Sequence, residues 1–181
     1  MAGYDSFRSI GPVMANVHAT GLRTALWRGD LGTELPLLAD GSPRPGANIT
    51  NGGHVMLTNE QTQAVVDAVN TASAKWKLAF NSGSAAGCVE HYEKDAVMHA
   101  RPFGTFTGTT EIQRFWQQLL DDGFSDVEYI DPKVDVVDET RALLTSGWKM
   151  NKAAGVIHKD LWVVQENGLA KLREDDFEAT S

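Results

Sequence analysis

The chain of 181 residues has a single cysteine, no long hydrophobic run and fewer basic than acidic residues. Cys88 alone cannot form an internal disulfide or a zinc site built from several cysteines, so we interpret it as a core residue. No stretch of 18 consecutive apolar residues occurs, and we expect no segment to span a membrane. The first residues, MAGYDSFRSI, lack the basic and apolar regions of a secretory signal, so we expect a cytoplasmic protein.

The shortage of basic residues limits the partners that the protein can have. Lys and Arg number 16 against 24 Asp and Glu, which gives a formal net charge of −8. Binding to a phosphate backbone or to an anionic membrane surface draws on clustered basic side chains, so we expect neither nucleic acid nor membrane as a partner. The hydrophobic content of 42% is that of a globular protein with a buried core.

Residues 1–57 differ in composition and periodicity from the rest of the chain. They contain Pro36, Pro43 and Pro45 among many glycines, without a sustained helical or strand period. We interpret them as an N-terminal arm preceding one domain at 58–181. Apolar residues such as Leu26 and Trp27 favour docking of residues 20–57 on the domain or on a partner subunit, and a disordered tail is the alternative.

Three helices are predicted in the first part of the domain. Thr58 and Gln61 form a capping-box pair, and an apolar stripe follows at helical spacing: Val65, Val69, Ala72, Trp76 and Phe80. Ser84 can cap a short second helix over 85–92. Thr109 or Thr110 can cap a third, which ends at Gly123 and has an inward face of Ile112, Phe115, Trp116, Leu119 and Leu120.

Strands alternate with these helices and then follow them. The segments DAVMHA and GTFTG predict two short strands before the third helix. After Gly123 the period becomes two, which predicts four long antiparallel strands, with Pro132 marking a bend or bulge. Asn167-Gly168 is the strongest turn signal in the chain. The order of helices and strands predicts an α+β fold.

This order, together with several local motifs, resembles the nuclear-transport-factor-2-like superfamily, in the branch of SnoaL-like polyketide cyclases and ketosteroid isomerases. The matching motifs are FNSG after the first helix, YEKDAVMHA at the first strand, GTFTG before TTEIQRFWQQL, and VVQENGLAKLREDDFE at the end. The resemblance covers roughly residues 58–178. It implies a cone-shaped, strongly curved antiparallel sheet wrapped around three helices, one deep apolar pocket, and a homodimer formed through the sheet. It also implies acid/base chemistry on a small apolar molecule without metal or organic cofactor.

The last hairpin brings several polar side chains together. A two-residue turn at Asn167-Gly168 places cross-strand neighbours about 5 Å apart at Cβ. One face then carries Trp162 opposite Arg173, Asp160 opposite Asp175, and His158 opposite Phe177. A register slip of one residue would move this set to the other face.

Two facing carboxylates resist joint ionisation, so this register predicts a raised pKa for Asp160 or Asp175. Such a pair can accept and return a proton, with His158 assisting. In the cyclases that the chain resembles, an acidic residue on the final strand has this role, and Asp175 falls at its position. The tyrosine and protonated aspartate of ketosteroid isomerases are not reproduced as a set. The alternative is that these residues are solvated charges on an exposed hairpin.

Further residues are candidates for the pocket wall. Trp116 and Trp148 are the expected apolar walls, with Trp162 and Arg173 beside them. His99 is expected near the pocket mouth on the first strand, and a structural role for it is the alternative. No metal-ligand spacing such as H-E-x-x-H is present, so no metal is expected.

Three functions remain open at this point. The first is a cofactor-independent isomerase, cyclase or lyase that acts on a small apolar molecule. The second is a non-catalytic ligand-binding or assembly module, which the N-terminal arm favours. The third is a metal-free carbonic anhydrase of the iota class, a family with a run of histidines where this chain has His158 alone.

Overall fold

The computed structural model describes residues 56–181, so the expectations for the arm, including the docking of Leu26 and Trp27, lie outside the described residues. Three helices are present in this part: α1 (Asn59–Asn81), α2 (Ala85–Val89) and α3 (Gly108–Asp121). Six strands accompany them: β1 (Tyr92–Arg101), β2 (Gly104–Thr107), β3 (Glu128–Val136), β4 (Arg141–Lys149), β5 (Ala154–Val164) and β6 (Ala170–Ala179). None of the helices within residues 56–181 is long and apolar enough to cross a membrane.

Helix α1 forms where its local signals predict it. The Thr58 hydroxyl accepts a hydrogen bond from the Gln61 backbone N–H at 3.1 Å, and the Gln61 side chain accepts one from the Thr58 N–H at 2.9 Å. This reciprocal cap satisfies two N–H groups that the first turn cannot pair. The predicted apolar stripe is buried in full: Val65, Val69, Ala72, Trp76 and Phe80.

The remaining helices confirm the predicted elements with shifted boundaries. The side chain of Ser84 caps α2 as expected, but α2 ends at Val89 and Tyr92 already begins β1. Helix α3 begins at Gly108, with Thr107 as its N-cap in place of Thr109 or Thr110. Four of its five predicted inward residues are buried and Leu120 is half-buried, and Cys88 of α2 is buried in the core.

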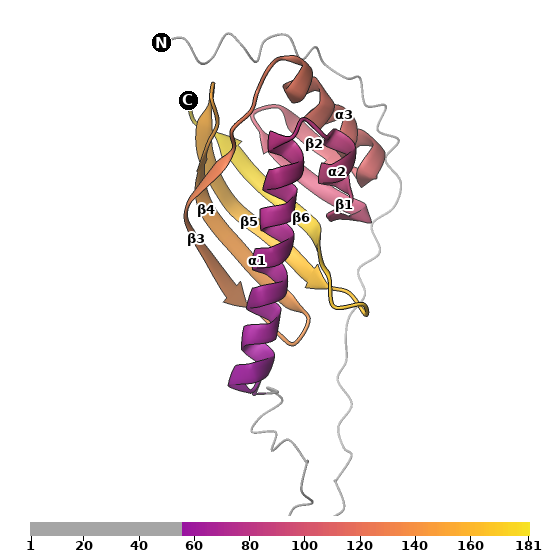
Figure 1. Ribbon diagram of the computed structural model, residues 1–181, viewed down its shortest axis with the longest axis vertical. Helices are drawn as coiled ribbons and strands as arrows, with labels where there is room; N and C mark the ends of the chain where they lie inside the picture. The colour runs from indigo at the N-terminus through magenta and orange to yellow at the C-terminus, as the bar shows by residue number, and fades with distance from the viewer. Residues whose placement is uncertain (1–55) are drawn as a thin grey trace, which may run out of the picture. The chain divides into compact units, whose positions relative to one another are not determined.

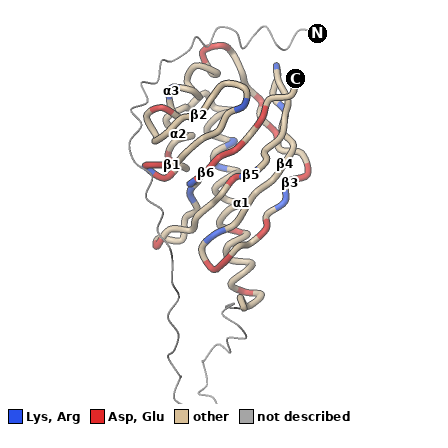
Figure 2. Tube along the Cα trace, turned by 180° about the vertical axis from the view of Figure 1, so that it is seen from behind, with Lys and Arg blue, Asp and Glu red and all other residues tan. Residues whose placement is uncertain are grey.

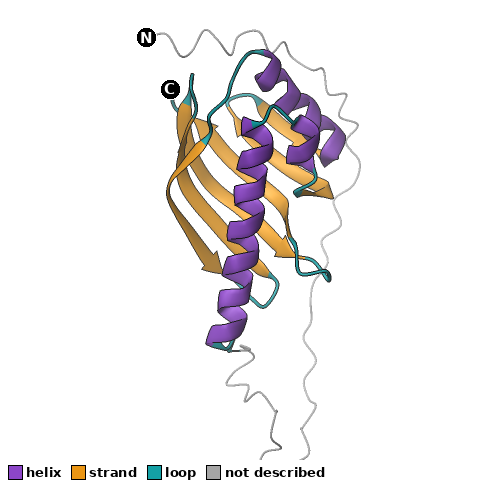
Figure 3. Ribbon diagram, viewed as in Figure 1, coloured by secondary structure: helices purple, strands orange, loops and turns teal. Residues whose placement is uncertain are grey.

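The strands form one curved sheet in the order β2-β1-β6-β5-β4-β3, covered on one face by the helices (Figures 1 and 3). The fold class is therefore confirmed as α+β, with a curved sheet packed on three helices. One feature differs from the expectation, because β1 pairs with β6 in parallel and the sheet is mixed. The other four pairings are antiparallel.

The outer face of the sheet, away from the helices, carries charged side chains. Ion pairs join neighbouring strands there, among them Arg101–Asp176, Lys159–Glu174 and Arg173–Glu93. Figure 2 shows acidic and basic residues interleaved along the strands. The inner face is apolar and aromatic, so burial of this face against α1 and α3 supplies the main driving force for folding.

Candidate active site

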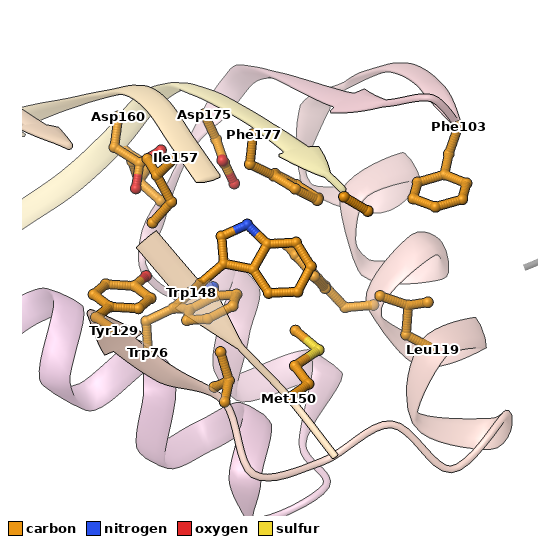
Figure 4. Close-up of a pocket in the computed structure, with 14 residues that line it drawn as sticks. Trp76, Phe103, Leu119, Tyr129, Trp148, Met150, Ile157, Asp160, Asp175 and Phe177 are labelled. Atoms are coloured by element: carbon orange, nitrogen blue, oxygen red, sulfur yellow. The ribbon is translucent and has the colours of Figure 1, made fainter. Parts of the chain in front are cut away.

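A cavity of about 40 Å³ lies between the inner face of the sheet and the helices (Figure 4). A water molecule needs roughly 10–15 Å³ by this measure, so the cavity can hold a few waters or a small ligand group. Its walls come from α1, α3 and the strands β3 to β6. The lining residues are Trp76, Phe103, Trp116, Leu119, Val127, Tyr129, Trp148, Met150, Ile157, Asp160, Leu172, Asp175, Phe177 and Ala179.

Aromatic rings form most of the wall. Trp116 stacks on Phe177 with ring centroids 5.7 Å apart, and Trp148 meets Phe177 edge-on at 6.1 Å. Trp76 packs edge-on against Trp116 at 5.0 Å. Figure 4 shows Trp148 lying between the side of Asp175 and Phe177 and the side of Met150. Flat apolar walls of this kind favour a flat, largely apolar ligand.

Two carboxyl groups interrupt this apolar wall. Asp160 on β5 pairs directly with Asp175 on β6, as the hairpin register predicted. Both residues are buried, at 2% and 5% exposure, and both line the cavity. Buried carboxyl groups are rare unless they are paired, because water no longer solvates their charge. The pair is the strongest chemical feature of the described part of the chain.

A short network of hydrogen bonds holds Asp175. The Tyr92 hydroxyl donates to Asp175 Oδ2 at 2.5 Å, and Trp116 Nε1 donates to the Tyr92 oxygen at 3.3 Å. The carboxyl groups of Asp160 and Asp175 are also hydrogen-bonded to each other, which requires that one of them keeps its proton. Three strands and α3 thus converge on one carboxylate.

The surroundings of the two carboxyl groups shift their pKa values by different amounts. Burial raises the pKa of Asp175 to about 6, and hydrogen bonds from Tyr92 and Asp160 oppose this rise. Burial also raises the pKa of Asp160 well above its usual range, and the neighbouring charge of Asp175 adds to the rise. At neutral pH the pair therefore holds one negative charge and one proton between its two carboxyl groups, and the stronger rise in the pKa of Asp160 favours the proton on that residue.

A buried tyrosine, Tyr92, and a half-buried one, Tyr129, accompany the acid pair. Burial and the nearby carboxyl groups raise the pKa of Tyr92 and of Tyr129 well above the usual value, so both stay protonated. Tyr129 lines the cavity from β3, and the ammonium of Lys77 lies 4.5 Å from its ring centre. A protonated tyrosine can donate a hydrogen bond to a ligand oxygen.

Three polar atoms of the lining residues have no hydrogen-bond partner within residues 56–181. They are Trp76 Nε1, Trp148 Nε1 and Asp160 Oδ1. A buried polar atom without a partner costs about 1–3 kcal/mol. Oxygen atoms or hydroxyl groups of a ligand could satisfy these atoms at the edge of the cavity.

The expected place of His158 in this cavity is wrong. A bulge between Ile157 and Lys159 makes His158 the extra residue of β5. The bulge turns Ile157 inward, and the His158 ring lies on the outer face, 42% exposed, with Nε2 2.9 Å from Glu178 Oε2. Burial of the apolar Ile157 is favourable, whereas an imidazole in its place would need a partner.

Arg173 and His99 also lie on the outer face rather than in the cavity. Arg173 is the extra residue at a second bulge, in β6, and binds Glu93 through Nε at 2.6 Å and Nη2 at 3.1 Å. On β1 the alternation is as predicted, but Met98 is the buried residue, which directs His99 outward to Thr105. The expectation that Arg173 and His99 contribute to this cavity is wrong.

The predicted tryptophan walls are placed largely as expected. Trp116 and Trp148 line the cavity. Trp162 is fully buried on the inner face opposite Leu172, but it lies outside the set of lining residues. Its register partner is Leu172 because the β6 bulge displaces Arg173.

Most apolar lining residues were not predicted as part of the site, and neither were three residues with a hydroxyl or indole N–H group: Tyr92, Tyr129 and Trp76. The sequence prediction extended the second helix through Tyr92, which hid its place at the start of a strand beside β6. Trp76 was interpreted as core, and it is both core and wall. Within residues 56–181 no group of three His, Cys, Asp or Glu side chains could hold a metal ion.

Comparison with known proteins places this geometry in a family. No curated protein matches the sequence. Among solved structures, a proposed scytalone dehydratase from Novosphingobium aromaticivorans is 14% identical with a TM-score of 0.60, covering 68% of this chain and 89% of its own. A ketosteroid isomerase-like protein from Erwinia carotovora atroseptica is 16% identical with a TM-score of 0.56, and the match covers 68% of this chain and 99% of that protein.

A hexachlorocyclohexane dehydrochlorinase, LinA-type3, from Novosphingobium barchaimii is 9% identical with a TM-score of 0.56, covering 68% of this chain and 92% of its own. At these identities the three structures show a shared fold and nothing finer. The family model of the SnoaL-like domain matches residues 74–166, slightly more than half of the chain. The chain therefore belongs to the SnoaL-like domain family, within the nuclear-transport-factor-2-like superfamily.

Proposed function

We propose that this protein is a cofactor-independent enzyme that moves a proton on a small, neutral, largely apolar molecule bound in the cavity. The observation that carries the proposal is the buried Asp160–Asp175 pair in an otherwise aromatic wall. Buried acid pairs with separated proton affinities are typical of general acid/base sites. A purely structural core gains little from such a pair, because two apolar residues would pack there at lower cost.

The two carboxyl groups suit different steps of one reaction. Asp175, ionised above about pH 6, removes a proton from a carbon next to a carbonyl group or to a leaving group. The electron pair of the broken C–H bond moves to the carbonyl oxygen, or expels the leaving group with formation of a double bond. Once Asp175 has taken the substrate proton and is neutral, the O–H of Asp160 leaves its hydrogen bond to Asp175 and donates a hydrogen bond or its proton to the oxygen that gains charge. Isomerisation and elimination both fit this scheme.

The charge and the polar atoms of the cavity restrict the substrate. Lys, Arg and His are absent from the lining residues within the described part of the chain, and Asp175 already supplies a negative charge at neutral pH. An anionic ligand would meet repulsion without a counter-ion, so a neutral ligand is favoured. The unpartnered indole N–H groups of Trp76 and Trp148 favour a ligand with oxygen atoms. A neutral carbonyl or hydroxy compound that places a small oxygen-bearing group in the cavity meets these conditions.

The structural neighbours support an enzyme of this class. Their names include a dehydratase, an isomerase-like protein and a dehydrochlorinase, whose chemistry involves loss or movement of a proton bound to carbon. These activities belong to those proteins and give this chain a direction for testing. The same fold also serves non-catalytic proteins.

The decisive experiment is hydrogen–deuterium exchange on candidate substrates in D₂O, followed by NMR. A panel of neutral cyclic ketones, enones and β-hydroxy ketones is incubated with wild-type protein, with Asp175→Asn and with Asp160→Asn. We expect exchange at the carbon next to the carbonyl, reduced about 100-fold or more in Asp175→Asn. Glu174→Gln is the matched control, because Glu174 lies one residue before Asp175 on β6 and its side chain binds Lys159 on the outer face.

The same panel separates catalysis from ligand binding. Binding of a panel member with equal exchange in wild type and both active-site variants would contradict the enzyme proposal and favour the ligand-binding module. CO₂ hydration is measured in parallel as the test of the carbonic anhydrase alternative.

We also propose that the protein is a cytoplasmic homodimer associated through the outer face of the sheet. Half-buried apolar residues, Val97, Leu143 and Leu161, lie among the ion pairs of that face. Sedimentation velocity at micromolar concentration tests the dimer, and a single species of about 20 kDa would contradict it. Cell fractionation tests the location.

A further inference from the structure

The parallel pairing of β1 with β6 is interrupted just before Asp175 of β6. Tyr92 pairs with Leu172, and the next paired residues are Val97 and Glu174. Five steps along β1 therefore correspond to two along β6. Backbone pairing alone leaves the position of Tyr92 relative to β6 weakly fixed here, although the Leu172 N–H donates to the His91 carbonyl at 2.8 Å.

Side chains on the outer face bridge this interrupted stretch. Glu93, which follows Tyr92, accepts two hydrogen bonds from Arg173, at 2.6 Å from Nε and 3.1 Å from Nη2. It also accepts one from Gln165 Nε2 at 2.9 Å. The Glu93 side chain is only 14% exposed, and the hydrogen bonds from Arg173 lower its pKa. A bidentate contact of this kind fixes orientation as well as distance.

Each partner of this ion pair adjoins a residue of the acid site. Glu93 is next to Tyr92, whose hydroxyl holds Asp175 on the inner face. Arg173 is the extra residue of the β6 bulge, two positions before Asp175. The ion pair on the outer face and the Tyr92–Asp175 hydrogen bond on the inner face therefore join the same two strands across the interrupted stretch.

We propose that the Arg173–Glu93 ion pair is a positioning device, which holds Tyr92 and Asp175 in hydrogen-bonding contact across the gap in the β1–β6 pairing. Arg173 and Glu93 touch no substrate and act through Tyr92 and Asp175. The consequence for catalysis rests on the proposed function, in which Asp175 is the base. The structural part of the inference concerns Asp175 and Tyr92 alone.

A readout on Asp175 itself separates positioning from simple stability. The Tyr92 hydrogen bond stabilises the ionised form of Asp175, so its loss raises the pKa of Asp175. The groups that face or influence this carboxyl group are Tyr92 and His99 of β1, Asp160 of β5, Asp176 of β6, Tyr129 of β3 and, through Tyr92, Trp116 of α3. None of them is changed in the variants described next.

The experiment removes the two charges of the pair one at a time, in Arg173→Met and Glu93→Gln, in the full-length chain. The pKa of Asp175 is read from the titration of its side-chain carboxyl carbon by NMR. Direct electrostatics predicts opposite results, because loss of the arginine charge raises the pKa and loss of the glutamate charge lowers it. Positioning predicts that both variants raise it, by about one unit.

Lys159→Met is the matched control. Lys159 binds Glu174 at 2.5 Å on the same face, in the stretch between the two bulges where β5 and β6 pair residue for residue. It removes a positive charge as Arg173→Met does, so any effect on Asp175 measures electrostatics without positioning. Arg173→Lys keeps the charge and one contact, and we expect a pKa between those of wild type and Arg173→Met.

Two results would overturn the inference. One is a lowered or unchanged pKa of Asp175 in Glu93→Gln, and the other is an equal rise in Lys159→Met and Arg173→Met. Full exchange activity of Asp175→Asn would instead contradict the proposed function and leave the pKa test intact. If Arg173→Met fails to fold, Glu93→Gln alone decides, because its expected direction is opposite to the electrostatic one.

Discussion

Replacement of Asp175 by asparagine should change how the stability of the protein depends on pH. Burial raises the pKa of Asp175 from 3.8 to about 6, so the folded protein holds this proton more tightly than the unfolded chain does. Stability therefore falls as pH rises from about 4 to about 6. A difference of about 2 pKa units corresponds to about 3 kcal/mol of unfolding free energy lost above pH 6. Asparagine does not titrate, so the variant should not lose this unfolding free energy as the pH rises.

Urea denaturation of wild type and Asp175→Asn at pH 4 and pH 8 measures the effect. We expect the stability difference, variant minus wild type, to rise by about 3 kcal/mol between the two pH values. Asp67→Asn, an exposed carboxylate on α1, is the control and should show a nearly constant difference. If the difference for Asp175→Asn is also constant, the carboxyl group is not destabilised by burial, and the assignment of its protonation is wrong.

Three further predictions test the packing around the site. Thr58→Ala should lower the unfolding free energy by about 1 kcal/mol through loss of the α1 cap, measured by urea denaturation. Gly155→Ala should destabilise the protein by roughly 1–3 kcal/mol or prevent folding. The added Cβ would lie 1.9 Å from the Glu178 carbonyl oxygen and 2.6 Å from the Trp148 ring. A variant as stable as wild type would contradict this geometry. Cys88 is fully buried with a pKa raised to about 12, so a thiol reagent should label it only after unfolding, and rapid labelling of native protein would show that α2 opens.

The helices could be predicted from the sequence because their signals are local. The cap of α1 and its apolar stripe use residues three or four positions apart, and the structure contains both. The parallel pairing of β1 with β6 could not be predicted in this way, because it joins segments about 80 residues apart. For the same reason the role of Tyr92 was missed, since its partner Asp175 is 83 positions away.

The last hairpin shows how a correct pair can follow from an incorrect turn. The sequence predicts a two-residue turn at Asn167-Gly168, whereas the Gln165 N–H donates to the Leu169 carbonyl and the loop contains three residues. Gly168 adopts a φ of 79°, which favours glycine at the last position of such a loop. The longer loop shifts the register by one, so that Trp162 pairs with Leu172. Continued along the strands, this register would place Glu174, and not Asp175, opposite Asp160.

Two bulges then decide which side chains reach the cavity. The bulge at Arg173 adds one residue to β6, which restores the Asp160–Asp175 pair and keeps both carboxyl groups inside. The bulge at His158 adds one residue to β5, which brings Ile157 inward and turns His158 out. Hydrophobic alternation cannot locate either bulge in advance, because an extra residue only interrupts a pattern that charged residues already interrupt here. The acid pair thus faces the cavity because one extra residue, His158 of β5 or Arg173 of β6, lies on each side of it. The side chain of Arg173 also binds Glu93 on β1, the strand that carries Tyr92.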